Sequence, residues 1–411
     1  MTSVDFSFWV LGVLAFLAAC YGMKRYRTPL NPLTIFTVTQ IGMFTILSGV
    51  VATHLTPKYT SADIVKTILV SIVYLCATTL PYLFHGSLLS NLYGKGLGLF
   101  GLNSESIALR FNAIKFVLLL VGAVSAFTAL ALVGGGGMLW LTNSRAAYIS
   151  YRAGAGPFFA LTQWLLTFAM VYCIWTIKPR VFKLLPILSF FCAAMYFLGS
   201  KNNVLLLPVI GLAYYNFYIR RISFMTFTML APLFFLAVLG LLVADGVYSS
   251  LMNAGLYFRD YFDTTAQFLS RFDEFGFRYG RGWLSSLWSY VPRALYHDKP
   301  YEYGVLLVHQ VFFPGAAALG NTPGFLSWTL DYLDFGVIGV FFSGLLGGIW
   351  QRMAYEYFLN HKQQFFAFIL AMQFSIWSVW TFAPLPILIV WSLSQSVFLK
   401  LVWRQKNMVA Q

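Results

Sequence analysis

Long apolar segments alternate with short polar connections along most of the chain. A transmembrane α-helix needs about 20 mostly apolar residues to cross the hydrocarbon core of a bilayer. Segments of about this length lie near residues 6–23, 33–51, 64–84, 112–133, 158–177, 184–199, 203–218, 224–243, 326–350, 364–382 and 385–402. The pattern predicts an all-α integral membrane protein with about eleven transmembrane helices, because a helix satisfies its own backbone hydrogen bonds in lipid.

The longest polar interruption runs from Asp245 to Pro323. This interruption divides the chain into three predicted parts. They are a bundle of about eight spans (1–243), one large loop with interfacial helices (244–325), and about three C-terminal spans (326–411). Tryptophan and tyrosine recur in the loop, and such amphipathic aromatic residues favour the membrane interface. We therefore expect helices near 253–263 and 283–297 to lie at the bilayer surface.

Basic residues gather in every second connection. They are Lys24, Arg25 and Arg27, then Lys95 and Arg110, then Lys178, Arg180 and Lys183, then Arg220 and Arg221, then Arg352 and Lys362, and finally Arg404 and Lys406. Because basic connections stay in the cytoplasm, the pattern predicts a multi-pass membrane protein with the N-terminus outside and the C-terminus in the cytoplasm. The large loop then lies on the outer face of the membrane.

Composition narrows the function classes. Charged residues make up 10% of the chain and hydrophobic residues 59%. The net charge of +14 comes from short clusters between spans, which favours anionic lipid headgroups as partners over nucleic acid. The sequence has no HExxH, CxxC, Walker, GxSxG or DxD motif, so we expect no metal and no cofactor.

Cations on the predicted outer face point to an anionic substrate, because short basic loops are disfavoured there. Arg145 and Arg152 are seven residues apart and share one helix face with Tyr148. Two guanidinium groups on one face suit a diphosphate, because each binds phosphate oxygens in a bidentate manner. The alternative is that both arginines reach to lipid headgroups. Lys201 lies in a second outer turn.

Further cations lie in the large loop. Arg278 and Arg281 stand among glycines that allow close backbone approach, and Arg293 and Lys299 follow. We expect these four residues to bind a diphosphate group as well. The alternative is that they neutralise nearby carboxylates in surface pairs.

Candidate bases lie close to the same loop. Asp331 is three residues from Asp334 at the outer end of the ninth span, where an ionisable group is costly to bury. His309 is the second candidate, because a histidine titrates near neutral pH. The alternatives are that Asp331 caps a helix and that His309 is a structural residue.

Three short motifs carry a resemblance to a known family. Residues 291–300 contain Pro292-Arg293 and Lys299-Pro300, residues 331–339 read Asp-Tyr-Leu-Asp-Phe-Gly-Val-Ile-Gly, and residues 199–201 read Gly-Ser-Lys. They resemble the PR…KP, Y-x-N-F-G-x-x-G and G-S-R motifs of the Wzy-type polysaccharide (O-antigen) polymerases. The chain has Asp334 and Lys201 where those motifs have asparagine and arginine.

The resemblance implies a GT-C-like glycosyltransferase of the bacterial inner membrane, with the N-terminus and the large loop in the periplasm. It would join undecaprenyl-diphosphate-linked oligosaccharide repeat units at the periplasmic face. The growing chain would move to the non-reducing end of a new repeat unit, and a Wzz-type chain-length regulator would be a partner. In that reaction Arg293 and the other cations would stabilise the leaving diphosphate. Asp331, or else His309, would accept the proton of the attacking hydroxyl group.

Two other functions stay open at this stage. An O-antigen ligase would share the layout and the lipid-linked donor but use a different acceptor. A flippase or transporter would need polar residues at mid-bilayer depth and usually internal repeats, and the sequence shows neither clearly.

Overall fold

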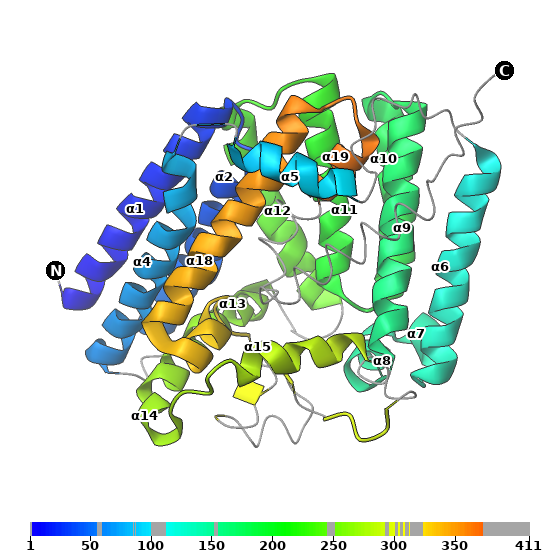
Figure 1. Cartoon of the computed structure of the whole chain (residues 1–411). Coiled ribbons are helices and arrows are strands. Elements are labelled where there is room, and N and C mark those ends of the chain that lie inside the picture. The colour runs from blue at the N-terminus through cyan, green and yellow to red at the C-terminus, as the bar shows by residue number, and fades with distance from the viewer. Residues whose placement is uncertain are drawn as a thin grey trace.

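Helices form every regular element in the part of the chain that the structure describes. Figure 1 shows the computed structural model of the whole chain. It describes residues 2–55, 60–84, 86, 88–99, 112–151, 155–244, 251–291, 296–300, 303–304, 307–308, 312 and 324–372. Within these residues six helices are long and apolar enough to cross a membrane. The all-helical architecture is confirmed for this part, and the total of eleven spans stays a prediction.

The first half of the chain forms helices at both edges of the bundle, with α1 and α4 at one edge and α6 at the other (Figure 1). Its helices are α1 (Ser3–Tyr26), α2 (Pro32–Phe36), the π-helical η1 (Thr37–Leu47), α3 (Ser48–Leu55), α4 (Ser61–Leu83), α5 (Leu88–Leu99), α6 (Ala113–Val133), α7 (Leu139–Thr142), α8 (Ser144–Tyr151) and α9 (Gly156–Ile177). Local polar residues start several of them. Thr2 and Asp5 form a capping box at α1, and the Asn31 side chain accepts from the Thr34 amide at α2.

The second half completes the bundle and carries the polar segments. Its helices are α10 (Val181–Tyr196), α11 (Lys201–Tyr214), the π-helical η3 (Tyr215–Ile219), α12 (Phe224–Ala244), α13 (Leu251–Ser270), α14 (Phe272–Phe275), α15 (Arg281–Ser285), the 3₁₀-helical η4 (Ser286–Tyr290), α18 (Thr329–Asn360) and α19 (Phe365–Ala371). The two apolar segments predicted near 184–199 and 203–218 are separate, short helices. The segment predicted near 385–402 lies outside the described residues.

Consecutive long helices run in opposite directions, so alternate connections meet at the same end of the bundle (Figure 1). One end, at the top of Figure 1, carries α5 and α19, and we call it the α5–α19 end. The opposite end carries α8, α14 and α15, and we call it the α8–α15 end. Among the described residues, the basic connections after α1, α9, η3 and α18, which the sequence predicts to be cytoplasmic, lie at the α5–α19 end.

A polar network joins three helices at the α5–α19 end. The carboxylate of Glu356 in α18 accepts hydrogen bonds from Arg25 (3.0 Å) and Tyr26 (2.9 Å) of α1 and from Arg352 (2.9 Å). Arg352 is 2% exposed and also donates to the carbonyl group of Pro81, in the last turn of α4. The arginines therefore satisfy carbonyl groups that a helix end leaves without partners.

Helix α18 packs along α4 through small residues. A Cβ atom at Gly344 would lie 3.0 Å from Ala77 Cβ, and one at Gly348 would lie 2.4 Å from the Thr78 carbonyl oxygen. The two glycines are four residues apart and so share a face, which lets the two helix backbones approach closely. This contact fixes α18, and the site described below is built on its first turns.

Helix α13 differs from the surface helix expected near 253–263. It packs against α3, α4 and η1, and Phe258 and Phe262 are buried. The Phe262 amide donates to the Ser48 hydroxyl group at 3.0 Å. Protein therefore covers much of the apolar face of α13, and this helix joins the start of the large loop to the bundle.

Candidate functional site

Helix α18 begins with a hook at the α8–α15 end (Figure 1). Gly336 interrupts the helix with φ 64° and ψ −150°, a conformation that favours glycine. A Cβ atom at Gly339 would lie 2.4 Å from the Asp331 carbonyl oxygen, although eight residues of straight helix span about 12 Å. The bend therefore folds residues 329–335 back beside the next turns and buries both Asp331 and Asp334.

Asp334 holds the large loop against the hook. Its carboxylate oxygens accept from the backbone amides of Gly282 (2.9 Å) and Trp283 (2.8 Å), which open helix α15. The side chain is fully buried, and it supplies the partners that the first amides of a helix otherwise lack. A side chain at Gly282 would collide with this carboxylate, since its Cβ would lie 3.0 Å from Oδ2. Asp334 is thus a structural clamp.

Asp331 is held by a different group of the same loop. The indole nitrogen of Trp283 donates to Asp331 Oδ1 at 2.8 Å, and the Ser343 hydroxyl group lies beside the carboxyl group. The side chain is 4% exposed. The residue that precedes α18 is Trp328, and no side chain caps this end. The hydrogen bond of Asp331 therefore joins it to Trp283 and does not cap the helix.

Two arginines flank the carboxylates on the same loop. The backbone amides of Arg278 and Tyr279 donate to the carbonyl groups of Leu333 (3.0 Å) and Asp334 (3.1 Å), so this segment is fixed to the hook. The guanidinium groups of Arg278 and Arg281 form no hydrogen bond or ion pair with any described residue. Arg281 is exposed and Arg278 is partly exposed. Within the described residues neither charge therefore has an ion-pair partner, and we call Arg278 and Arg281 the uncommitted arginines.

The Arg145 helix packs on the turn that contains the Gly-Ser-Lys motif. Arg145 Nη1 lies 3.5 Å from the Gly199 carbonyl oxygen, and its guanidinium carbon lies 5.3 Å from the centre of the Tyr148 ring. A Cβ atom at Gly199 (φ 64°) would lie 2.1 Å from the Ser144 carbonyl oxygen. The structure thus brings together two outer-face features predicted separately. The backbone of Lys201 starts α11 beside this contact.

The α15–η4 segment connects the hook of α18 with the neighbourhood of α8. It starts at the Asp334 carboxylate, and η4 contacts α9, the helix that follows α8 in the chain. Figure 1 shows both features at the same end of the bundle. The candidate site therefore comprises two groups at one end of the bundle, namely Asp331 with the loop of Arg278 and Arg281, and the Arg145–Tyr148 pair.

Of the remaining predicted site residues, one is described by the structure and three lie outside the described residues. Lys299 is buried, and its ammonium group donates to the Val291 carbonyl oxygen at 2.9 Å and lies 4.6 Å from the centre of the Tyr303 ring. This placement favours a structural role within the loop. Arg152, Arg293 and His309 lie outside the described residues, so their roles stay predictions.

Trp283 is the site residue that sequence reasoning missed. It appeared as one of several interfacial aromatic residues, and nothing in its local sequence distinguishes it from Trp288. Its significance comes from its contacts, because its backbone binds Asp334 and its indole binds Asp331. Within the described residues no three histidine, cysteine or acidic side chains gather as a metal site would require.

The described part of the chain thus defines an all-helical protein with six helices long and apolar enough to cross a membrane, and with a polar site at one end. The chain is 25% identical over 231 residues to the O-antigen polymerase of Salmonella typhimurium, and equally so to that of Salmonella typhi. Each alignment covers 55% of this chain, which spans about half the length of the curated relatives it matches. No known family profile and no solved structure matches the chain.

Proposed function

We propose that this protein is an inner-membrane polysaccharide polymerase that joins lipid-linked oligosaccharide repeat units. The observation that carries the proposal is the buried Asp331 carboxylate, held by Trp283 in the same loop that carries Arg278 and Arg281. The names of the two Salmonella relatives support the same class of activity.

The donor and the acceptor are two glycans, each attached to undecaprenyl diphosphate. A hydroxyl group at the non-reducing end of the acceptor attacks the anomeric carbon of the donor chain. The bond between that carbon and the diphosphate oxygen breaks, and undecaprenyl diphosphate leaves with both electrons. Asp331 accepts the proton of the attacking hydroxyl group as general base.

Cations at the α8–α15 end stabilise the negative charge that develops on the leaving diphosphate. Fixed charges of this kind often contribute the largest part of catalysis. Arg278 and Arg281 are the described candidates, and Arg293 is the predicted one. Arg145, with Tyr148, is the candidate for a second lipid-linked diphosphate, together with the predicted Arg152 and Lys201. His309 is the alternative base.

The proposal places the α8–α15 end in the periplasm. The uncommitted arginines at this end then face the compartment in which the basic-connection rule disfavours them, and an anionic substrate explains their presence. A Wzz-type regulator of chain length is the expected protein partner.

Gene deletion followed by gel electrophoresis of surface polysaccharide tests the proposal. A polymerase mutant loses the ladder of long chains but keeps a single repeat unit on its acceptor. A ligase mutant instead loses all repeat units from the acceptor and accumulates polymer on the lipid carrier. An unchanged ladder contradicts both functions.

A further inference from the structure

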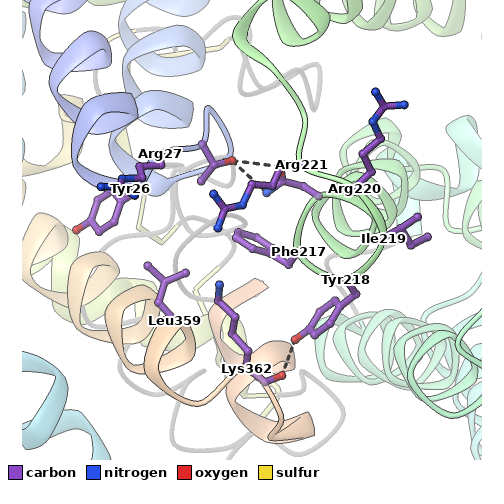
Figure 2. A pocket seen from close by; sticks show the side chains of 11 residues that line it. Tyr26, Arg27, Phe217, Tyr218, Ile219, Arg220, Arg221, Leu359 and Lys362 are labelled. Atoms are coloured by element: carbon purple, nitrogen blue, oxygen red, sulfur yellow. Dashed lines mark hydrogen bonds between the residues drawn. The ribbon is translucent and has the colours of Figure 1, made fainter.

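A basic pocket lies at the α5–α19 end, opposite the candidate site (Figure 2). It forms where the ends of α1, η3 and α18 meet, and its volume is about 210 Å³. The sequence predicts only that the cations of these three segments lie on the same side of the membrane. The structure shows that they share one cavity, although their segments are far apart in the chain.

Four cationic residues line the pocket: Arg27, Arg220, Arg221 and Lys362. None of their side chains forms a hydrogen bond or an ion pair with a described residue. The Lys362 ammonium group lies 5.9 Å from the centre of the Phe217 ring, which forms part of the wall. Like charges that line one pocket repel one another, so the pocket favours a bound anion.

No carboxylate neutralises these cations among the described residues. The lining contains neither aspartate nor glutamate. Glu356 belongs to the same end, but Arg25, Arg352 and Tyr26 already bind its carboxylate group. The sequence beyond Glu356 contains no acidic residue.

Hydrogen bonds hold the walls of the pocket in place. Asn216 Nδ2 donates to Thr28 Oγ1 at 3.0 Å, and Asn216 Oδ1 accepts from the Ile222 amide at 2.9 Å. The Tyr218 hydroxyl group donates to the Lys362 carbonyl oxygen at 2.8 Å, as the dashed line in Figure 2 marks. These bonds connect α1, η3 and the end of α18, so the ligand does not have to organise its site.

We propose that this pocket binds a phosphate group. Guanidinium groups suit phosphate oxygens, and basic pockets between membrane helices bind anionic headgroups. The phosphate comes either from an anionic phospholipid of the adjacent leaflet or from a soluble phosphate compound. Binding here is separate from the proposed polymerase reaction, because the pocket lies at the other end of the bundle.

Lipid binding to the purified full-length protein in a nonionic detergent tests the proposal. The probes are dioctanoyl phosphatidylglycerol, its zwitterionic phosphatidylcholine counterpart and inorganic phosphate, each measured by native mass spectrometry. The pocket variant combines Arg27→Gln, Arg221→Gln and Lys362→Gln. The control variant combines Lys24→Gln, Lys178→Gln and Arg180→Gln, which removes the same charge from exposed residues outside the pocket.

The wild type and the control variant are expected to bind phosphatidylglycerol. The pocket variant is expected to bind it about a hundredfold more weakly, because three cations that attract the anionic headgroup are removed. Phosphatidylcholine is expected to bind weakly to all three proteins. If millimolar inorganic phosphate displaces phosphatidylglycerol from the wild type, the phosphate comes from a soluble compound. If phosphatidylglycerol stays bound at that phosphate concentration, the phosphate comes from the lipid. Equal phosphatidylglycerol affinity in the pocket and control variants overturns the proposal.

Size-exclusion chromatography shows whether the pocket variant is folded. The single variant Arg221→Gln, at an exposed position, gives the same test with a smaller expected loss.

Discussion

At the scale of single residues, Asp331 and Asp334 show how neighbouring carboxylates acquire different roles. Asp334 accepts two backbone amides and so fixes the loop, whereas Asp331 accepts from one indole nitrogen. Substitution of Asp334 is expected to disturb the fold of the loop. Asp331 is the carboxylate whose chemistry can be tested with the loop in place.

Asp331→Asn is expected to slow chain extension about a hundredfold or more, because an amide cannot accept the proton. Its carbonyl oxygen can still accept from Trp283, so the fold is retained. The measurement is extension of purified lipid-linked repeat units in vitro. Asp273→Asn, which changes an exposed carboxylate near the same end, is the control and is expected to be active. Near-normal extension by Asp331→Asn would move the role of base to His309.

Arg278→Ala and Arg281→Ala are each expected to slow extension roughly tenfold to a hundredfold, because they remove charge that stabilises the leaving diphosphate. Lysine at either position is expected to restore only part of the rate, since a point charge does not replace a bidentate fork. Arg271→Ala is the matched control, because Glu274 already binds that guanidinium group at 3.0 Å. If all three alanine variants have equal rates, Arg278 and Arg281 have no part in the mechanism.

At the scale of elements, the hook of α18 and the α15–η4 segment form one unit. The bend at Gly336 turns two carboxylates toward the loop, and the loop amides and indole complete their hydrogen bonds. The conformation of one glycine therefore determines whether the candidate site exists.

Gly336→Ala is expected to destabilise the protein by about 1–3 kcal/mol, because alanine resists a positive φ and its Cβ would lie 2.9 Å from the Phe277 ring. Gly347→Ala in the same helix is the control, since no atom lies within 4 Å of its Cβ position. Alanine there is expected to be neutral or to stabilise the helix by about 0.5–1 kcal/mol. Thermal unfolding in detergent compares the two variants. Equal melting temperatures would show that the bend imposes no constraint.

At the scale of the whole molecule, each end of the bundle carries cations that have no ion-pair partner among the described residues. Arg278 and Arg281 are such cations at the α8–α15 end, and the cations of the basic pocket lie at the α5–α19 end. Orientation in the membrane then decides which set of charges meets the substrate.

Cysteine labelling tests that orientation in a variant from which Cys20, Cys76, Cys173 and Cys192 have been removed. Ser270→Cys at the α8–α15 end is expected to react with an impermeant maleimide in intact spheroplasts, because this end is proposed to face the periplasm. Ser223→Cys at the other end is the matched control and is expected to react only after the membrane is opened. Both serines are exposed, so accessibility alone does not separate them. The reverse result would exclude the proposed site from the periplasm.

The sequence by itself determined where the helices form and which basic connections lie at the same end of the bundle. Apolar runs of spanning length became helices such as α4 and α9 within a few residues of the predicted bounds, because helix formation in lipid depends on local composition. The i,i+4 pair of Arg259 and Asp263 was also predictable, and the structure places the two groups 3.6 Å apart.

Only the tertiary structure decided which groups meet. Trp283 and Asp331 are 48 residues apart, and Arg145 lies 54 residues from Gly199. No spacing rule links such residues, because their contact depends on how whole helices pack and on the bend at Gly336. The same packing buried Lys299 within its own loop and gathered Arg27, Arg221 and Lys362 around one pocket. Local sequence patterns thus determined where the helices form, and long-range packing determined which side chains lie together.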